Sequence, residues 1–226
     1  MADPLELSID TASEVASIAL SGEGRLVAEA TWQAGREHGR QLLPAVEALL
    51  ARHDATKDGL TAVFVCTGPG AYAGVRAGVS TAKGLAYALE LPLAGVGRLE
   101  IEAYAFAATG RPVVAVHKAG RGELAWAAYH GDPWREVSPP RLSKPAQLVE
   151  RLREGTLVVG EIDETLAALL PDHAVIAPAS ASIRRAATLA ELGFARLSAG
   201  ARDEAALLRP IYLRPPVISL GPKPGD

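Results

Sequence analysis

The spacing of hydrophobic positions changes within the first 53 residues of the chain. Leu5 to Asp10 alternates apolar and polar side chains, and two further strand-like runs, Val15 to Leu20 and Leu26 to Thr31, follow after short turns. From about Glu37 to His53 the apolar positions fall three and four residues apart, which predicts an amphipathic helix. The chain is therefore expected to begin with an antiparallel meander of three strands followed by a helix.

Strands and helices alternate in the next stretch. A continuous apolar strand, Thr61 to Cys66, precedes a glycine-rich loop and a helix from about Ala73 to Glu90. A short strand, Leu93 to Val96, precedes a helix from about Arg98 to Thr109. Because strands that alternate with helices favour parallel pairing through crossover connections, residues 1–110 are expected to form one α/β half.

The second half, residues 111–214, opens like the first. Glu123 to Tyr129 repeats the Glu-apolar-Ala pattern of Glu14 to Leu20, a weak duplication that chance could also produce. The tail, residues 215–226, is rich in proline and glycine and is expected to be flexible. The remaining expected elements are a break at Ser138-Pro139-Pro140, helices near Pro145 to Arg153, Thr165 to Leu170 and Ser182 to Phe194, and strands at Thr156 to Val159 and Val175-Ile176.

Composition narrows the function classes. The 226 residues carry 23 Lys and Arg against 26 Asp and Glu, a formal charge of −3, so no broad polyanion-binding surface is indicated. Cys66 is the single cysteine, which excludes an internal disulfide and favours a reducing compartment. No apolar run approaches the length of a membrane helix, and the first residues lack a signal-peptide pattern. A cytoplasmic protein without a membrane partner is expected.

The strongest local motif is the glycine-rich loop and the helix that follows it. Gly68 and Gly70 flank a proline in a turn that suits an anion, but Lys83 lacks the neighbours of a Walker lysine. The helix contains Gly74, Gly78 and Gly84, each of which costs about 1 kcal/mol relative to alanine. The favoured explanation is that another backbone packs closely against these glycines and offsets their cost to the helix. The alternative is that the glycines serve only the turn.

Candidate catalytic groups are few. Asp10, followed by Thr11 and Ser13, would stand at the carboxyl edge of a sheet where α/β folds bind ligands, but a local Asx or Ser/Thr turn is the favoured interpretation. The five histidines show no pair at helical spacing, and H-E-x-x-H and G-x-S-x-G are both absent from the sequence. Neither a histidine metal site nor a nucleophile elbow is therefore predicted.

Five segments resemble, in order and in spacing, the TsaB (YeaZ) family: Leu7 to Ala12, His38 to Pro44, Gly68 to Gly78, Thr81 to Ala86 and Pro210 to Arg214. The resemblance covers nearly the whole chain. It implies an actin-like (ASKHA) α/β fold of two ribonuclease-H-like halves, each with a mixed sheet flanked by helices. That expectation agrees with the meander, the strand–helix units and the suspected duplication.

The resemblance also implies a function. TsaB-type proteins are non-catalytic partners of TsaD, which transfers a threonylcarbamoyl group to N6 of adenosine 37 in tRNAs that read codons beginning with A, and TsaE, an ATPase, joins the pair. We accordingly expect a scaffold that forms a homodimer when alone, contacts tRNA through the complex, and needs no cofactor because ATP acts through the partner subunits. No catalytic residue and no metal ligand are assigned to this chain.

The partner interface implied by the family lies on the two helices of the first half. Its expected residues are His38, Leu42, Val46, Gly74, Arg76, Gly78, Thr81, Leu85 and Leu89. A vestigial nucleotide pocket would involve Asp10, Thr11, Gly68 and Gly70.

Two departures from the family patterns concern chemistry. The metal motif of the catalytic relative falls here on Val96, Arg98, Glu100 and Glu102, so that both histidine positions hold non-ligands. The A-x-D-A-R motif of many TsaB sequences is replaced around His117, where the acid is missing. The first departure argues against transferase or peptidase activity, and the second argues against a nucleotide-like pocket between the halves.

Two alternatives remain open at this stage. One is a small ATPase or phosphotransferase of the actin and sugar-kinase superfamily, motivated by Asp10 and the loop at Gly68 to Gly70. The other is direct tRNA binding through four basic residues, Arg36, Arg40, Arg76 and Lys83.

Overall fold

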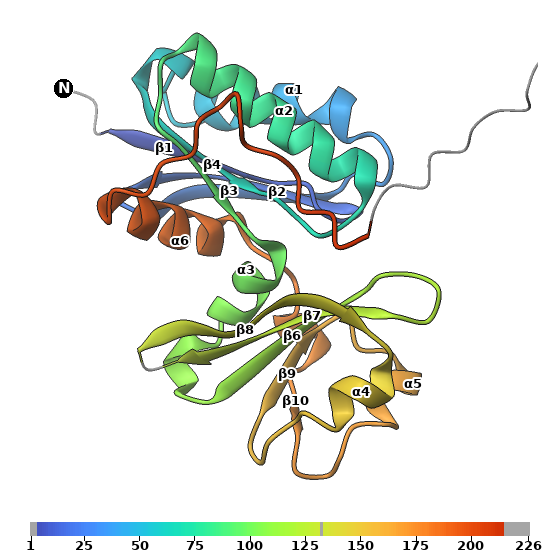
Figure 1. The fold of residues 1–226 in the computed structure, drawn as a ribbon. Coiled ribbons are helices and arrows are strands. Elements are labelled where there is room, and N and C mark those ends of the chain that lie inside the picture. The colour runs from blue at the N-terminus through green and yellow to red at the C-terminus, as the bar shows by residue number, and fades with distance from the viewer. Residues whose placement is uncertain (1–3, 132, 215–226) are drawn as a thin grey trace, which may run out of the picture.

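The computed structural model describes residues 4–131 and 133–214, which form two bodies, each built on a five-stranded mixed sheet (Figure 1). The first sheet has the order β3-β2-β1-β4-β5, in which β1 pairs antiparallel with β2 and parallel with β4. Its strands are β1 (Leu5–Asp10), β2 (Val15–Gly22), β3 (Arg25–Gln33), β4 (Leu60–Cys66) and β5 (Leu93–Val96). The predicted meander and parallel units are confirmed.

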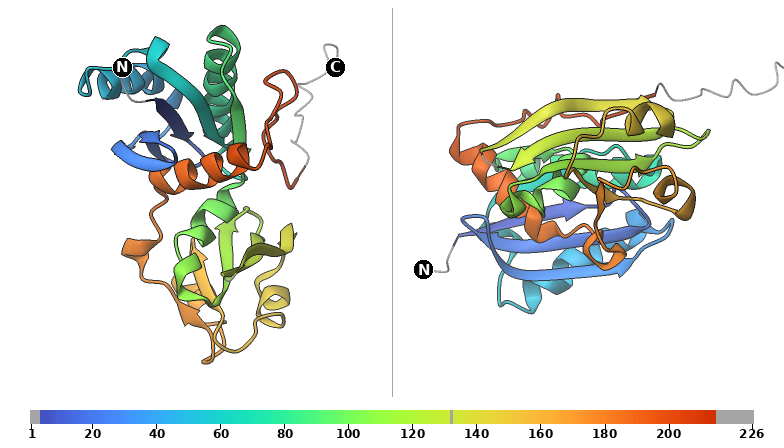
Figure 2. Two further views of the ribbon diagram at one scale, coloured as in Figure 1. Left: turned by 90° about the vertical axis from the view of Figure 1, so that its left-hand side faces the viewer. Right: turned by 90° about the horizontal axis from the view of Figure 1, so that it is seen from below.

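Helices cover both faces of the first sheet. α1 (His38–Ala51) and α2 (Tyr72–Ala88) lie on one face, and α6 (Ala186–Ser198) lies on the other (Figure 2). Apolar residues at helical spacing point inward, for example Leu42 and Val46 of α1, and both are buried in the core of this body. Burial of these amphipathic stripes is what stabilises the helices against the sheet.

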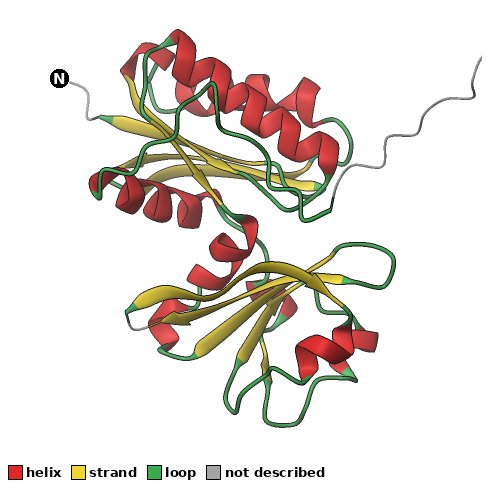
Figure 3. Cartoon of the chain, in the orientation of Figure 1, coloured by secondary structure: helices red, strands yellow, loops and turns green. Residues whose placement is uncertain are grey.

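The second sheet repeats the connectivity of the first. Its order β10-β9-β6-β7-β8 has the same antiparallel meander and two parallel strands, so the suspected duplication is real at the level of topology. One face packs on α3 (Arg98–Tyr104), and the other packs on α4 (Pro145–Val149) and α5 (Glu164–Ala167) (Figure 3). The strands are β6 (Pro112–Lys118), β7 (Leu124–Gly131), β8 (Trp134–Ser143), β9 (Leu157–Gly160) and β10 (Val175–Ile176).

Three predicted boundaries were wrong. Pro139 and Pro140 do not break the chain but lie within β8, an edge strand where the missing N–H groups need not cost ladder hydrogen bonds. The α-helix that begins at Arg98 ends at Tyr104, and a separate 3-10 turn follows at Ala107–Thr109. The last helix begins at Ala186 rather than Ser182, because a 3-10 turn precedes it.

The chain returns to the first body after the second sheet is complete. α6 places Leu189 and Leu192 in the first core, and residues 199–214, here named the C-terminal strap, run along β5. The Asp203 N–H donates to the Leu93 carbonyl at 2.8 Å. The second half predicted as 111–214 therefore differs from the observed arrangement, in which 186–214 pack on the first body. The tail predicted at 215–226 lies outside the described residues.

The glycines of α2 have two different environments. A Cβ on Gly74 would stand 2.3 Å from the Thr11 carbonyl oxygen, and one on Gly78 would stand 2.3 Å from Thr11 Oγ1. These glycines let α2 pack closely on the end of β1 of the same chain, which corrects their assignment to a partner surface. Gly84, in contrast, is exposed and has no atom within 4 Å of the position its Cβ would take.

This difference predicts opposite effects of one substitution at two positions. Gly78→Ala should lower the free energy of unfolding by about 1–3 kcal/mol, because the new methyl overpacks against Thr11. Gly84→Ala should raise it by about 0.5–1 kcal/mol, because alanine is the better helix former and the site is open. Urea denaturation of the two variants measures both values, and equal effects would contradict the packing role of Gly78.

Candidate functional site

A cleft of about 500 Å³ lies between the two bodies. The turn after β1 and the loop before α2 form one wall, the end of β6 forms the other, and the C-terminal strap closes one side. Its ionisable lining residues include Glu14, His117, Lys118, Glu161 and Arg214. This is the carboxyl edge of β1, where the sequence analysis favoured a local turn over ligand-binding chemistry.

Asp10 ends β1 and is engaged by an arginine from far along the chain. Arg184, in the linker before α6, donates from Nε to Asp10 Oδ2 at 2.8 Å and from Nη2 to Ser13 Oγ at 2.8 Å. The side chains of Asp10 and Arg184 are 2% and 7% exposed. Burial alone would raise the pKa of Asp10, but Arg184 outweighs it, so this pKa lies below its ordinary value. Asp10 is therefore a charged, internally paired carboxylate.

Arg184 also reaches the second body. Its Nη1 donates to Glu102 Oε1 of α3 at 3.0 Å, and Arg98 Nε donates to the same oxygen at 2.9 Å. Glu102 Oε2 accepts no hydrogen bond from the described residues. The linker arginine thus joins β1 of the first body to α3 of the second through buried charges.

The ion pairs continue to the wall of the cleft. Arg98 Nη2 donates to Glu161 Oε1 at 2.6 Å, and Glu161 Oε2 lies 2.9 Å from His117 Nδ1 and accepts from the Lys118 N–H at 3.0 Å. Partial burial raises the pKa of Glu161, but His117 and Arg98 lower it by more, so the net shift is well below the ordinary value. We name the group Asp10, Glu102, Glu161, Arg98, Arg184 and His117 the inter-body network.

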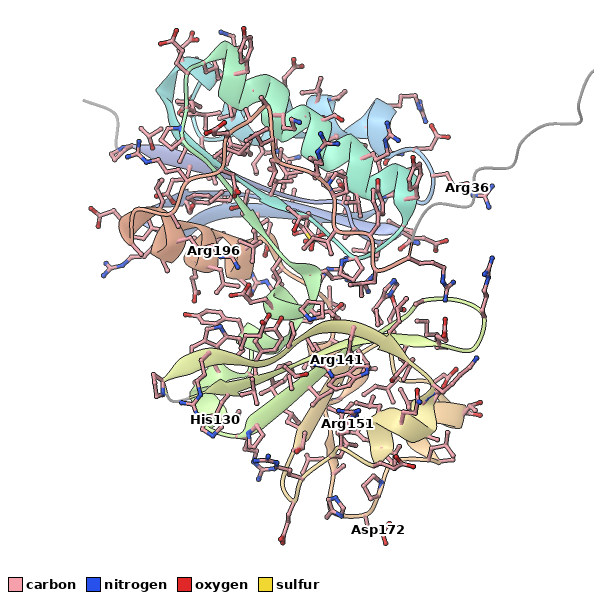
Figure 4. All side chains as sticks on the ribbon, viewed as in Figure 1. Arg36, His130, Arg141, Arg151, Asp172 and Arg196 are labelled. Carbon is pink, nitrogen blue, oxygen red and sulfur yellow. The ribbon has the colours of Figure 1, made fainter. Side chains whose placement is uncertain are left out.

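The resemblance placed the metal motif of a catalytic relative on residues 96–102. In the structure, charged side chains of this segment form ion pairs within the chain. Arg98 is buried within the inter-body network, and Glu100 pairs with Arg196 of α6, labelled in Figure 4. Among the described residues no group of three or more His, Cys, Asp or Glu side chains could hold a metal ion. Burial raises the pKa of the Cys66 thiol, which keeps it protonated at neutral pH.

The residues of the expected nucleotide pocket are mostly occupied by contacts within the chain. Asp10 binds Arg184, and Thr11 Oγ1 donates to the Gly74 carbonyl at 2.7 Å in a buried position. Gly68 adopts a positive φ of 89°, and its carbonyl accepts from the Arg98 N–H. Of the four residues, Gly70 alone lines the cleft of about 500 Å³.

Five of the nine expected interface residues are not at the surface. His38, Leu42, Val46, Gly74 and Gly78 are buried, and the ring Nε2 of His38 lies 2.7 Å from the Ser13 carbonyl oxygen. Their assignment to a partner interface is therefore corrected, because an apolar stripe on a helix packs first on the helix's own sheet. Arg76 is exposed, and Thr81, Leu85 and Leu89 are half-buried, so for these four the assignment stays a prediction.

Sequence reasoning missed the residues that α1 and α2 leave outside the core. Leu43 is 48% exposed on α1, and Tyr87 is 83% exposed on α2. Gly39 and Gly84 lie on the same helices with open space beside them. We name Gly39, Leu43, Gly84 and Tyr87 the helix-pair face. The helical periodicity of the sequence could have identified them, because these positions fall outside the stripe of apolar residues that each helix buries.

No helix within the described residues is long and apolar enough to cross a lipid bilayer.

Two sheets of the same connectivity, flanked by helices on either side of a cleft, define the actin-like class of α/β proteins. The activator of 2-hydroxyisocaproyl-CoA dehydratase from Clostridium difficile, solved with bound ADPNP, shares this fold with a TM-score of 0.51 at 10% identity, over 87% of this chain and 96% of that one. At this identity the likeness shows the fold alone.

Within this class the chain belongs to the TsaB (YeaZ) family. YeaZ from Pseudomonas aeruginosa has a TM-score of 0.80 and 26% identity, over 93% of this chain and 100% of that one. The tRNA threonylcarbamoyladenosine biosynthesis protein TsaB of Escherichia coli (strain K12) is 35% identical over 153 residues, and the match spans 66% of each chain. The family described as TsaD, tRNA N6-adenosine threonylcarbamoyltransferase, also matches residues 32–208.

Two adjacent arginines provide a matched test of the inter-body network. Arg184→Ala should lower the free energy of unfolding by about 3–5 kcal/mol, because it leaves Asp10 and Glu102 as buried charges without this partner. Arg185→Ala removes a 58% exposed arginine from Glu29, which keeps its hydrogen bond from the Ala187 N–H, and should cost less than about 1 kcal/mol. Urea denaturation compares them, and comparable losses in the two variants would contradict the proposed bridging role.

Acid should destabilise the protein through Glu161. Because its pKa is lowered in the folded state, its contribution to stability is present above the ordinary glutamate pKa of about 4.3 and is lost as the pH falls below it. The melting temperature should therefore decline between about pH 5 and pH 3. Glu161→Gln should flatten this decline, and a profile identical to that of the parent chain would refute the assignment.

Proposed function

We propose that this chain takes part in the synthesis of N6-threonylcarbamoyladenosine in tRNA as a pairing subunit without catalytic activity of its own. Membership of the TsaB family supports the pathway, since the Escherichia coli relative is named for it. Two ion pairs within the chain support a non-catalytic role. Asp10 is paired with Arg184, and Arg98 is paired with Glu102, so that both side chains have structural partners.

The helix-pair face is the observation that carries the pairing role. Gly84 lies inside a helix, where it costs about 1 kcal/mol relative to alanine, and no contact with the described residues requires it. Leu43 and Tyr87 expose apolar surface beside the two glycines. Small residues next to apolar ones allow helices of a second protein to approach closely and bury that surface.

The orientation of α1 agrees with a continuous face. Gln41 Oε1 accepts from Trp32 Nε1 of β3 at 2.9 Å, so that side of α1 points toward β3. Leu43, about 200° further around the helix, lies on the side toward α2. Leu43 therefore lies on the side of α1 that faces α2, the helix that contains Gly84.

The partner of this face would be a TsaD-type catalytic subunit, with a TsaE-type ATPase joining the pair. A second copy of the chain would occupy the same face when the partner is absent. ATP would act through the partner subunits, so that the chain itself needs no cofactor. The assembly would work in the cytoplasm, in keeping with the single, buried Cys66.

A small ATPase or phosphotransferase is the second candidate. It is favoured by the cleft, which places Lys118 and Arg214 near Gly70 in a fold class where a distant neighbour was solved with ADPNP. The pairing of Asp10 with Arg184 argues against it, because a carboxylate needed to hold a magnesium nucleotide would first have to leave its arginine.

The pairing role is tested by a bulky charge on the helix-pair face. Gly84→Arg should weaken binding to the catalytic partner at least tenfold, because the side chain blocks close helix approach while the fold has room for it. Size-exclusion chromatography with light scattering measures the complex, and titration calorimetry measures its affinity.

Gly59→Arg is the matched control, since Gly59 is also exposed, has open space beside it and lies outside both helices. It should bind the partner like the parent chain. Full binding by Gly84→Arg, or no complex with the parent chain, would contradict the proposal.

A further inference from the structure

A groove of about 460 Å³ lies between α2 and the C-terminal strap, and it shares Tyr212 with the lining of the inter-body cleft. Arg76 and Lys83 of α2 line one side of it, and Arg209 and Tyr212 of the strap line the other. Among the described residues that line it there is no aspartate or glutamate, although the whole chain carries a formal charge of −3. We name it the strap groove. Its charge is therefore locally positive, and it is complementary to phosphate.

The basic residues of the groove come from one stripe of α2. At about 100° per residue, Tyr72, Arg76 and Lys83 fall on the same side of the helix, whereas Gly84 of the helix-pair face lies about 100° away from Lys83. Lys83 Nζ donates to the Leu208 carbonyl at 3.1 Å and so fixes the strap beside the helix. Gly84 therefore lies on a different side of α2 from the strap groove, whereas Tyr87, four residues after Lys83 and about 40° from it, lies on the side of the groove.

A pair of exposed aromatic rings stands at one end of the groove. Tyr72 and Tyr212 stack with their centroids 5.4 Å apart and an interplanar angle of 29°, and they are 49% and 41% exposed. The guanidinium of Arg76 lies 5.2 Å from the centroid of the Tyr72 ring. Stacked tyrosines held at the surface beside arginines offer ring surface on which a nucleobase can stack.

We propose that the strap groove binds single-stranded RNA. Arg76, Arg209 and the free donor of Lys83 would contact successive phosphates, and an unpaired base would stack on the Tyr212 ring. The adjoining aromatic rings favour a single strand, because the bases of a duplex are stacked on one another and cannot reach them. The inference rests on the proposed function, since that function makes tRNA the substrate of the assembly.

The predicted set of RNA-binding residues changes accordingly. Arg76 and Lys83 line the strap groove, but Arg36 and Arg40 are not among its lining residues, and Arg40 pairs with Glu37. In the proposed set of RNA-binding residues, Arg209 takes the place of Arg36 and Arg40. Arg209 has no ion pair within the described part of the chain.

Fluorescence anisotropy with a labelled 12-nucleotide single-stranded RNA tests the proposal on the isolated chain. Binding at low salt should weaken with a log–log slope of about −2, as expected for three phosphate contacts on a single strand. Arg209→Ala should reduce affinity several-fold and make the slope shallower by about 0.7. Arg202→Ala, an exposed strap arginine outside the groove lining, is the matched control and should bind like the parent chain.

The aromatic part of the proposal has its own variants. Tyr212→Ala should lower affinity about tenfold, and Tyr212→Phe should retain it, because phenylalanine keeps the ring for stacking. Melting temperatures of both variants establish that the strap remains folded. No binding at low salt, equal losses in Arg202→Ala and Arg209→Ala, or equally tight binding of a duplex of the same length would overturn the inference.

Failure of this test is distinguishable from failure of the proposed function. Pairing with the catalytic partner is measured without RNA, and RNA binding is measured without the partner. If the partner binds and RNA does not, the strap groove proposal alone is overturned.

Discussion

The guanidinium of Arg184 connects the end of β1 in the first body to α3, the helix that packs on the second sheet. It binds Asp10 at the end of β1, Ser13 in the following turn and Glu102 on α3. Two carboxylates buried at this depth would be strongly unfavourable without a cation. The arginine offsets that cost and, in doing so, fixes the second body against the first. Together with the ion pairs of Arg98, this contact joins the two bodies beside the cleft.

The same contact shapes what the protein can do. In a fold class with a cleft suited to ligands, the carboxylate at the edge of β1 is held by the chain's own arginine, and Arg98 is held in ion pairs with Glu102 and Glu161. The side chains that remain available for binding lie on the outer surface of the first body. There α1 and α2 leave an apolar face with open glycines, and the C-terminal strap forms a basic groove with α2. We have proposed both as binding surfaces of a subunit that acts by assembly.

Local patterns predicted most of the fold, because hydrophobic periodicity is dictated by the sheet and helix faces that each segment buries. The meander, the parallel units and the repeated topology all follow from it. The Arg184–Asp10 pair could not be predicted, since it joins residues 174 positions apart and Arg184 resembles a solvated helix residue in the sequence. Gly78 was misassigned for a related reason: a glycine pattern indicates close packing but not which backbone approaches. The packing partner, Thr11, comes from the same chain.

The most direct test of this account is to measure threonylcarbamoyladenosine formation in tRNA by mass spectrometry, with the catalytic partner and either the parent chain or a folded Asp10→Asn variant. The account predicts that product requires the partner, that the chain alone makes none, and that Asp10→Asn supports the reaction as well as the parent chain, because Asp10 has a structural role. Loss of product with Asp10→Asn, while its complex with the partner still forms, would show that Asp10 takes part in the chemistry and would contradict the account.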